Sequence, residues 1–265
     1  MKIKRKTAFK YSQCVKTLLL GGLMSLGIAA SGTQAESHDE DEIAFSEANI
    51  YFELNNTDGD LGIHALIDGD PWKKLVIEDP YERKMLKVKV KGRLRKQGMT
   101  EFFFESAEPS FDELEPEDFF ERFPEGYYEV EGLSLEGEEL ESKAYLSHVM
   151  PAPAADITVS GVKYADDCDA FVPEVSTPIT IAWSPVNSSH PDIGASGDVI
   201  VDRYQLVVEI EESETLVYSV DLPPGTTSLS VPEEFISLGE EFKYEILVRE
   251  SSGNQTAVES CFAIK

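Results

Sequence analysis

The sequence predicts an all-β protein made of two β-sandwich-like domains, the first of which carries one short helix. Three observations support this fold class. Short runs of alternating apolar and polar residues recur along the chain and are separated by turn-forming residues, as in half-buried strands. The composition shifts at a Pro/Ala-rich run over residues 150–155. A helical apolar stripe occurs once, around residues 110–123.

The N-terminal segment, residues 1–35, is expected to be a signal peptide. Six basic residues precede and border an apolar run, 18–30, which is followed by the small-residue site Thr33-Gln34-Ala35, the layout of a secretory leader. The alternative is an uncleaved anchor, but the run is short for a membrane span, which needs about 20 residues. The protein is therefore expected to be exported, to the periplasm or the extracellular space, with no membrane span after signal cleavage.

The charge of the chain is strongly acidic. The formal net charge is −27, and cleavage, which removes 6 of the 23 basic residues and none of the 50 acidic ones, lowers it to −33. Such a surface repels nucleic acid and anionic lipid at long range, so a nucleic-acid partner is not expected. Solubility explains this charge more simply than a cationic partner does. The acidic stretch 36–47 is expected to be disordered.

Residues 48–149 are predicted to form an antiparallel β domain with one helix. Ser110 stands three residues before Glu113, the spacing of a capping box, and Pro116 suits a first helical turn. Phe119, Phe120 and Phe123 then give the apolar stripe. The expected strands are 49–54, 61–67, 74–78, 85–91, 100–105, 127–134 and 139–149.

Two Asp-Gly-Asp triplets, at 58–60 and 68–70, raise the question of a calcium site. An EF-hand placed with Asn56 at position 1 would have Leu61 at position 6 and Ile67 at position 12, where Gly and Glu are required. Asp-Gly is also a frequent hairpin signal, so both triplets are interpreted as tight turns. One calcium hypothesis remains: in a meander the carboxylates of Asp58, Asp60 and Asp79 would meet at one end of the sheet. No other cofactor is expected.

A basic strip lies within the same domain. Residues 73–97 hold 10 of the 17 basic residues that remain after cleavage. A period of two places a row of charges on one face of a strand and makes it a candidate for binding an anion, such as phosphate or an acidic polysaccharide. The alternative is internal pairing, since residues 101–141 hold 16 acidic side chains. The row consists of Lys87, Lys89, Lys91, Arg93 and Arg95.

Two cysteines, Cys168 and Cys261, remain after cleavage. In an oxidising compartment an even pair indicates a disulfide, here closing a loop of 93 residues (261 − 168). The alternative is a pair of buried free thiols. A catalytic cysteine is not expected, because the nucleophile needs a base partner and reducing conditions.

Residues 156–265 follow a stiff Pro/Ala linker, 150–155, and carry an ordered set of strand motifs. The first strand would be 157–162, the second 179–183 with Trp183, and the third 202–208 with Tyr204. Strands at 218–222 and 228–231 follow, and Leu238 then stands six residues before Tyr244. Residues 257–264 would close the sandwich. This set resembles the fibronectin type III family, including its tyrosine corner. Loops 185–200 and 251–255 would then lie at one end, where ligands often bind.

No catalytic motif is visible. The histidines after residue 35 have no metal-ligand spacing, and there is no His-Glu-x-x-His, Cys-x-x-Cys, Gly-x-Ser-x-Gly or P-loop. We therefore expect a non-enzymatic binding protein for a protein or polysaccharide ligand at the cell envelope. The alternative is an accessory subunit or weak hydrolase acting on envelope polysaccharide. Three Asn-x-Ser/Thr sites, at Asn55, Asn187 and Asn254, would accept glycans in a eukaryotic host.

Overall fold

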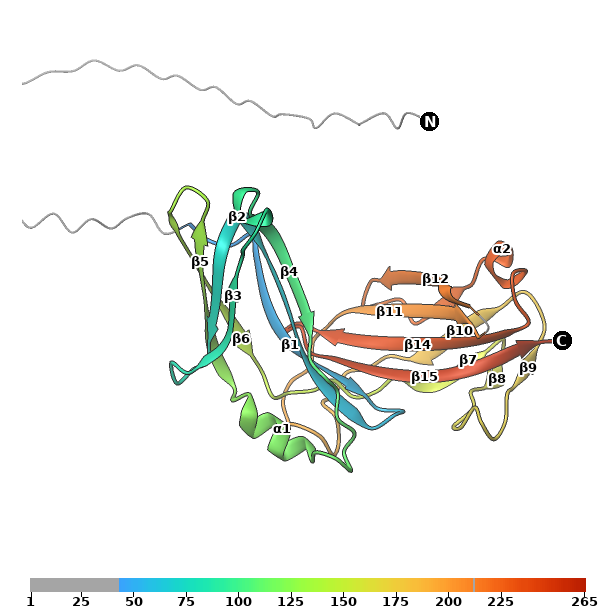
Figure 1. Ribbon diagram of the computed structural model, residues 1–265. Coiled ribbons are helices and arrows are strands. Elements are labelled where there is room, and N and C mark those ends of the chain that lie inside the picture. Colours follow the sequence, from blue (N-terminus) through green and yellow to red (C-terminus); the bar gives the residue numbers. More distant parts are fainter. Residues whose placement is uncertain (1–42, 212) are drawn as a thin grey trace, which may run out of the picture. The chain divides into compact units, whose positions relative to one another are not determined.

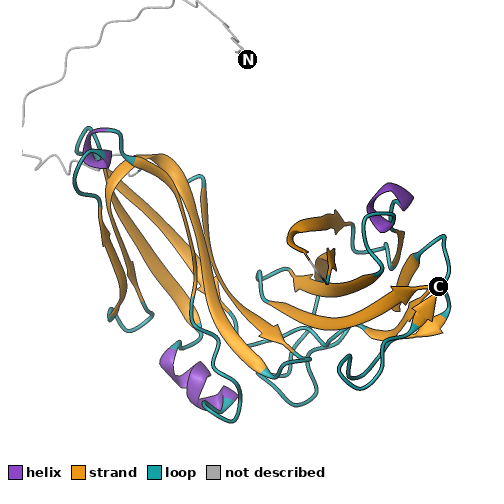
Figure 2. Cartoon of the chain, turned by 45° about the vertical axis from the view of Figure 1, so that its right-hand side comes forward, coloured by secondary structure: helices purple, strands orange, loops and turns teal. Residues whose placement is uncertain are grey.

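The structure, a computed structural model, describes residues 43–211 and 213–265 (Figure 1). The expected signal peptide and residues 36–42 of the predicted disordered stretch 36–47 lie outside the described residues and stay predictions. Residues 43–47 are ordered, contrary to prediction, because Phe45 is buried in the core and the first strand begins at Glu47. Strands dominate the described chain, and helices are short (Figure 2). The predicted all-β class is therefore confirmed.

The first half of the described chain is built around one long strand, β2. Its first part pairs antiparallel with β1 and β4, and its second part pairs antiparallel with β3 and β5. β6 continues the sheet beyond β5. The elements are β1 (Glu47–Asn55), β2 (Asp60–Glu78), β3 (Lys84–Lys89), the 3-10 helix η1 (Leu94–Lys96), β4 (Met99–Glu105), α1 (Pro116–Arg122), β5 (Gly126–Ser134) and β6 (Glu139–Leu146).

Only one of the two predicted Asp-Gly-Asp turns forms. The first triplet closes the β1–β2 hairpin, where Gly59 has φ +70° and donates its N–H to the carbonyl of Asn55 at 2.9 Å. The second triplet lies inside β2, so the predicted strands 61–67 and 74–78 are one strand. The pairing register shifts between Asp68 and Trp72, and the indole of Trp72 is fully buried. Burial of this side chain and pairing on both sides outweigh the local turn preference.

The predicted helix forms with Pro116 in its first turn, as expected, but the predicted capping box at Ser110 does not form. Ser110 accepts the N–H of Glu113 at 2.8 Å through its backbone carbonyl, which makes a turn. α1 begins six residues later at Pro116, where the fixed φ of proline suits a first helical residue. Phe119 and Phe120 are buried against Phe52, at ring distances of 6.0 and 5.1 Å. Among the described helices, none has the length and apolar character that crossing a membrane requires.

The second half is a sandwich of two sheets with the fibronectin type III order of strands. One sheet has the order β13-β10-β7-β8, and the other contains β12-β11-β14-β15. Trp183 on β10 packs against Tyr204 on β11 with ring centroids 5.4 Å apart, which joins the two sheets. The elements are β7 (Ala155–Val159), β8 (Val162–Lys163), β9 (Glu174–Val175), β10 (Thr180–Ser184), β11 (Val201–Ile210), β12 (Ser213–Leu222), β13 (Ser228–Ser230), α2 (Glu233–Ile236), β14 (Glu241–Glu250) and β15 (Gln255–Ile264).

The resemblance to fibronectin type III domains is thus confirmed by topology, with one departure. Tyr244 lies buried on β14 as predicted, but Leu238 is 58% exposed. The leucine follows the short helix α2 and does not contribute to the core. Leu238 therefore does not take the buried position that the resemblance to a tyrosine corner implies.

The two halves share one sheet. β1 pairs in parallel with β15, and Glu53 lies opposite Gln255. The order β12-β11-β14-β15-β1-β2-β5-β6 consequently runs through both halves, while each half keeps its own apolar core. Residues 150–155, predicted as a linker, include the buried Met150 and Ala154. The extended pairing places side chains from both halves on one common sheet face.

Candidate functional site

The three carboxylates of the calcium hypothesis are not brought together. Asp58 and Asp60 lie at the β1–β2 turn, whereas Asp79 follows the other end of β2. The carboxylate of Asp79 is 2.7 Å from two guanidinium nitrogens of Arg83 and accepts the N–H of Tyr81 at 2.9 Å. Burial opposes ionisation of Asp79, but the hydrogen bonds from Arg83 and Tyr81 outweigh it and lower its pKa. The predicted calcium set is wrong because β2 is one strand and Asp79 already has a cationic partner.

The predicted basic strip is only partly a strand. Lys87 and Lys89 lie exposed on β3, which ends there. The chain then turns at Gly92, with φ +65°, and continues into η1. Arg93 and Arg95 therefore do not extend the face of β3, contrary to prediction, although all five predicted basic side chains are exposed.

The side chains of the basic strip, defined as Lys87, Lys89, Lys91, Arg93 and Arg95, are not paired with acids. No carboxylate oxygen of the described residues lies within 4.0 Å of any of them. The acidic strand β5 pairs with the opposite edge of β2, so the predicted pairing of the strip with acidic neighbours does not form. Lys89 instead lies directly opposite Lys74, and like charges in that position repel each other.

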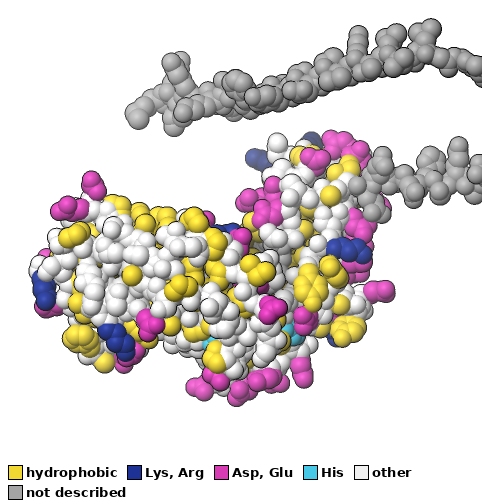
Figure 3. Space-filling view, turned by 180° about the vertical axis from the view of Figure 1, so that it is seen from behind, with side chains coloured by type: hydrophobic (Ala, Val, Ile, Leu, Met, Phe, Trp, Pro, Cys, Tyr) yellow, Lys and Arg dark blue, Asp and Glu magenta, His cyan; other side chains and the backbone are white. Residues whose placement is uncertain are grey.

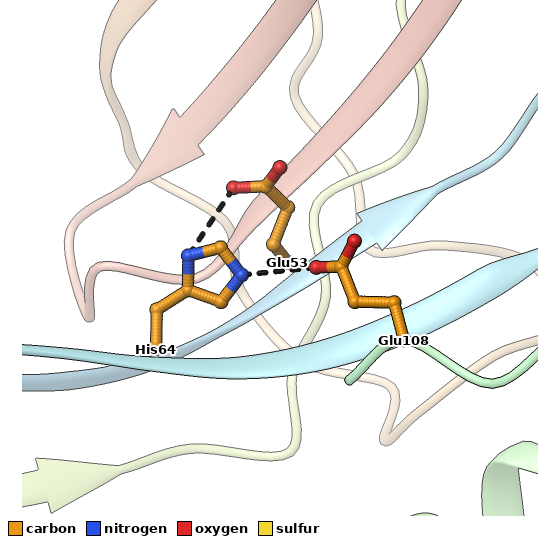
Figure 4. A group of neighbouring side chains, drawn as sticks. All are labelled: Glu53, His64 and Glu108. Carbon is orange, nitrogen blue, oxygen red and sulfur yellow. Dashed lines mark hydrogen bonds and ion pairs between the residues drawn. The ribbon is translucent and has the colours of Figure 1, made fainter. Parts of the chain in front are cut away.

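A second group of polar side chains, which the sequence did not reveal, consists of Glu53, His64 and Glu108. The hairpin register pairs Tyr51 with His64 and Glu53 with Gly62, so Glu53 and His64 share one face of the sheet. Nε2 of His64 is 3.0 Å from Oε1 of Glu108, and its Nδ1 is 3.7 Å from Oε2 of Glu53 (Figure 4). The imidazole thus lies between two carboxylates, which we call the Glu-His-Glu cluster.

The position of Glu108 depends on contacts between strand β2 and the segment that follows β4. Ser106 follows β4 and is held to β2 twice: its N–H donates to the carbonyl of Ile63, and its Oγ accepts the N–H of Ile63, both at 3.0 Å. A Cβ on Gly62 would lie 2.8 Å from Cγ of Glu108. The missing side chain at Gly62 therefore leaves the space in which the Glu108 side chain crosses β2.

His64 is only 3% exposed, while both carboxylates of the cluster reach solvent. The ring of Tyr51 lies 5.3 Å from the imidazole, and the ring of Phe103 lies 6.0 Å from it. Gln255 on β15 donates a hydrogen bond to Oε2 of Glu53. The second half of the protein therefore helps to position one of the two carboxylates.

Further carboxylates surround this cluster on the shared sheet face. Burial, followed by the charges of Glu108 and Asp58, raises the pKa of Asp60 to about 6. Burial also raises the pKa of Glu53, although His64 opposes the shift. In Glu245, burial together with the charges of Glu53 and Glu259 raises the pKa to about 8. Acidic side chains outnumber basic ones on the side of the molecule drawn in Figure 3.

The raised pKa of Glu245 predicts a stability that falls with rising pH. The folded protein holds this proton up to about pH 8, whereas the ordinary glutamate value is 4.5. Between these two values the folded state binds more protons than the unfolded state, so the free energy of unfolding decreases as pH rises. One such group contributes a slope of at most about 1.4 kcal/mol per pH unit. Glu245→Gln is expected to flatten the decrease and to stabilise the protein at pH 8.

Urea unfolding at pH 5, 6, 7 and 8 measures this effect. Glu241→Gln is the matched control, because Glu241 lies exposed on the same strand. It should leave the pH profile of the wild-type protein unchanged. A Glu245→Gln profile parallel to that of the wild type would contradict the expectation.

The two loops considered as a place where a ligand could bind lie against the first half. In loop 185–200, Nε2 of His190 is 3.0 Å from Oδ1 of Asn56, and the N–H of Ala195 donates to the carbonyl of His148 at 2.7 Å. In loop 251–255, Asn254 is fully buried. This end of the sandwich is therefore a junction between the two halves. The two loops form part of that junction, which corrects the idea that they are available to a ligand.

The predicted disulfide forms between Cys168 and Cys261, with Cα atoms 6.0 Å apart. It attaches the segment between β8 and β9 to β15. A hollow of about 390 Å³ lies beside it and is lined by Asp58, Asp166, Asp167, Asp169, Lys243 and Glu259, among others. The bridge is structural, because neither sulfur is free to act as a nucleophile.

Known proteins resemble this chain only in structure. No protein-family model matches it, and no curated protein matches it. The similar solved structures include the FN1–FN3 domains of chicken CNTN1, with a TM-score of 0.34 and 10% identity, covering 84% of this chain and 65% of that one. A tetra-tandem repeat from the extending region of a large adhesion protein has a TM-score of 0.28 and 10% identity, covering 83% and 50%.

A third similar structure is that of a 1.5-MDa bacterial ice-binding adhesin, described for host cell surface retention. It has a TM-score of 0.24 and 12% identity, covering 85% of this chain and 66% of that one. The chain spans between half and two thirds of the length of these three structures.

Proposed function

We propose that the protein is an exported binding protein that holds an acidic polysaccharide of the cell envelope on its basic strip. One observation carries the proposal. The five side chains of the strip are exposed and have no acidic partner among the described residues, in a chain whose formal net charge is −27. Internal ion pairing would have neutralised these charges if they served stability alone.

The position of the strip supports an external ligand. β3 has only one pairing partner, β2, and is therefore an edge strand. Lysine on an edge strand also discourages pairing with a second chain, which explains one or two lysines but not a row that continues through η1. The opposed pair Lys74 and Lys89 is repulsive without an anion, and a bound carboxylate or sulfate would relieve that repulsion.

Export is part of the same proposal. The disulfide between Cys168 and Cys261 suits an oxidising compartment, and the basic and apolar layout of residues 1–35 suits secretion. The fibronectin type III-like half would then serve as a rigid support, because its sheet continues directly into the first half.

Retention on immobilised acidic polysaccharide tests the proposal. The full exported chain should bind heparin and polygalacturonate but not neutral dextran, and binding should weaken with added salt because the charges are exposed. The double reversal Lys87→Glu/Lys89→Glu should lower the affinity at least about 10-fold. The control Lys163→Glu/Lys265→Glu makes the same change in net charge at exposed positions of the second half and should bind as the wild type does.

Each other outcome has a definite meaning. Equal loss of binding in both double variants would show an effect of net charge and would overturn the assignment to the strip. No retention on either acidic polysaccharide would overturn the proposal. Retention followed by release of shortened sugar chains would favour the hydrolase alternative, for which the proton-holding carboxylates Asp60 and Glu245 offer acid groups.

A further inference from the structure

We propose that Glu53, His64 and Glu108 form a binding site for one divalent transition-metal ion of the zinc type. These three residues each offer one ligand atom, and the three atoms lie within 4.8 Å of one another. Among the residues that the structure describes, no other group of three or more His, Cys, Asp or Glu side chains meets this condition. The site lies apart from the basic strip and does not depend on the proposed polysaccharide function.

The donor set points to zinc rather than calcium. Zinc accepts imidazole nitrogen and carboxylate oxygen at about 2.0–2.2 Å, whereas calcium and magnesium take oxygen ligands almost entirely. The 3.0 Å between Nε2 of His64 and Oε1 of Glu108 needs to lengthen only to about 3.4 Å to hold a tetrahedral zinc ion between the two atoms. A carboxylate oxygen of Glu53 also lies within 4.8 Å of the ligand atoms of His64 and Glu108, so Glu53 supplies the third ligand through a small shift of its carboxylate.

The site is built into the sheet rather than assembled from loose surface groups. His64 lies buried on the central strand β2. The segment carrying Glu108 is fixed by the two hydrogen bonds between Ser106 and Ile63, and Glu53 is held by Gln255. Gly62 has no Cβ, and a Cβ at this position would contact the Glu108 side chain. Metal ligands held by such a supporting shell bind more tightly than unsupported ones.

The charge around the cluster also favours a cation. The carboxylates of Glu53 and Glu108 lie 3.7 and 3.0 Å from the two nitrogens of the same imidazole, so two acidic groups face one small volume. A protonated imidazole brings a single positive charge to these carboxylates, whereas a divalent ion brings two. The competing explanation is therefore an ion-paired His64 that binds no metal, and the experiment separates the two.

Calorimetric titration of the full exported chain, after treatment with EDTA and dialysis, tests the site. We expect one Zn²⁺ per chain at pH 7, no heat with Ca²⁺ or Mg²⁺, and a higher melting temperature when Zn²⁺ is present. His64→Gln should weaken zinc binding by more than about 100-fold, and Gly62→Ala by about 10-fold because Glu108 is displaced. Glu101→Gln is the matched control, because Glu101 is an exposed carboxylate on β4, and it should bind zinc as the wild type does.

The melting temperature of each metal-free variant shows whether it is folded. A His64→Gln protein that is folded and binds zinc with wild-type affinity would overturn the proposal. So would the absence of zinc binding by the folded wild type. In that case, nuclear magnetic resonance signals from an imidazole protonated on both nitrogens at pH 7 would identify the cluster as an ion pair.

Discussion

Replacing Asn254 with alanine is expected to cost about 3–5 kcal/mol of the free energy of unfolding. The side chain is 0% exposed, and all of its polar groups are used. Its Oδ1 accepts the N–H of Phe52 at 2.8 Å, and its Nδ2 donates to the carbonyls of Ser147 and Val149 at 2.8 and 3.0 Å. Alanine would leave these three groups without partners, and an unsatisfied buried group costs about 1–3 kcal/mol.

Urea unfolding of Asn254→Ala and of the wild type measures this loss. A small domain is typically stable by about 5–15 kcal/mol, so the midpoint should move far toward lower urea. Asn187→Ala is the matched control, because Asn187 is an exposed asparagine in the same half, and it should change stability by less than about 0.5 kcal/mol. A loss below about 1 kcal/mol for Asn254→Ala would contradict the described junction.

The burial of Asn254 also corrects one of the glycosylation sites in the sequence. An acceptor asparagine must present its amide to solvent, whereas both amide atoms of Asn254 bond to the first half. The folded protein therefore offers no acceptor at this position, whatever the host.

Removing the disulfide is the second change with a large expected effect. Cys168 and Cys261 close a loop of 93 residues, and such a loop restricts the unfolded chain by about 4–5 kcal/mol in the chain-entropy model. The native contacts of the attached segment survive without the bridge, because Oγ of Ser260 donates to the carbonyl of Ala165 at 2.9 Å, and the N–H of Ala263 donates to the carbonyl of Pro173 at 2.8 Å. The loss of stability is therefore expected to come from the greater conformational freedom of the unfolded chain without the disulfide.

The double variant Cys168→Ala/Cys261→Ala should unfold at markedly lower urea than the oxidised wild type. Reduction of the wild type with dithiothreitol should produce a similar shift, whereas the same reductant should leave the double variant unchanged. Equal midpoints for the oxidised and the reduced wild type would show that the bridge does not stabilise the protein.

Local patterns predicted most of the strands because each depends on its own alternation of side chains. The runs around Phe52 and Tyr204 alternate over several residues, and each forms a strand close to its predicted bounds. Trp72 shows where this approach fails. The residues around Trp72 favour a turn by their local sequence. Burial of the Trp72 side chain and strand pairing on both sides of β2 nevertheless keep the chain extended.

At the candidate sites, too, local sequence patterns predicted some residue positions and missed others. Period two correctly placed Lys87 and Lys89 on one face of a strand, and Gly92, with its positive φ, ended that face before Arg93. The hairpin register across Asn55 and Asp60 contains enough information to place His64 opposite Tyr51. Glu108 had no such signal, because its approach to His64 depends on pairing between β2 and β4, which are distant in sequence.

The parallel pairing of β1 with β15 bears on the order in which the protein can fold. Phe52 and Asn254 are 202 residues apart in the sequence, yet they are hydrogen-bonded neighbours in the sheet. A nascent chain usually completes its N-terminal domain first, but here the earliest strand has an open edge until β15 has been synthesised. The first half therefore matures together with the second, and a ribosome-bound chain that lacks β15 exposes an unpaired edge to chaperones and proteases.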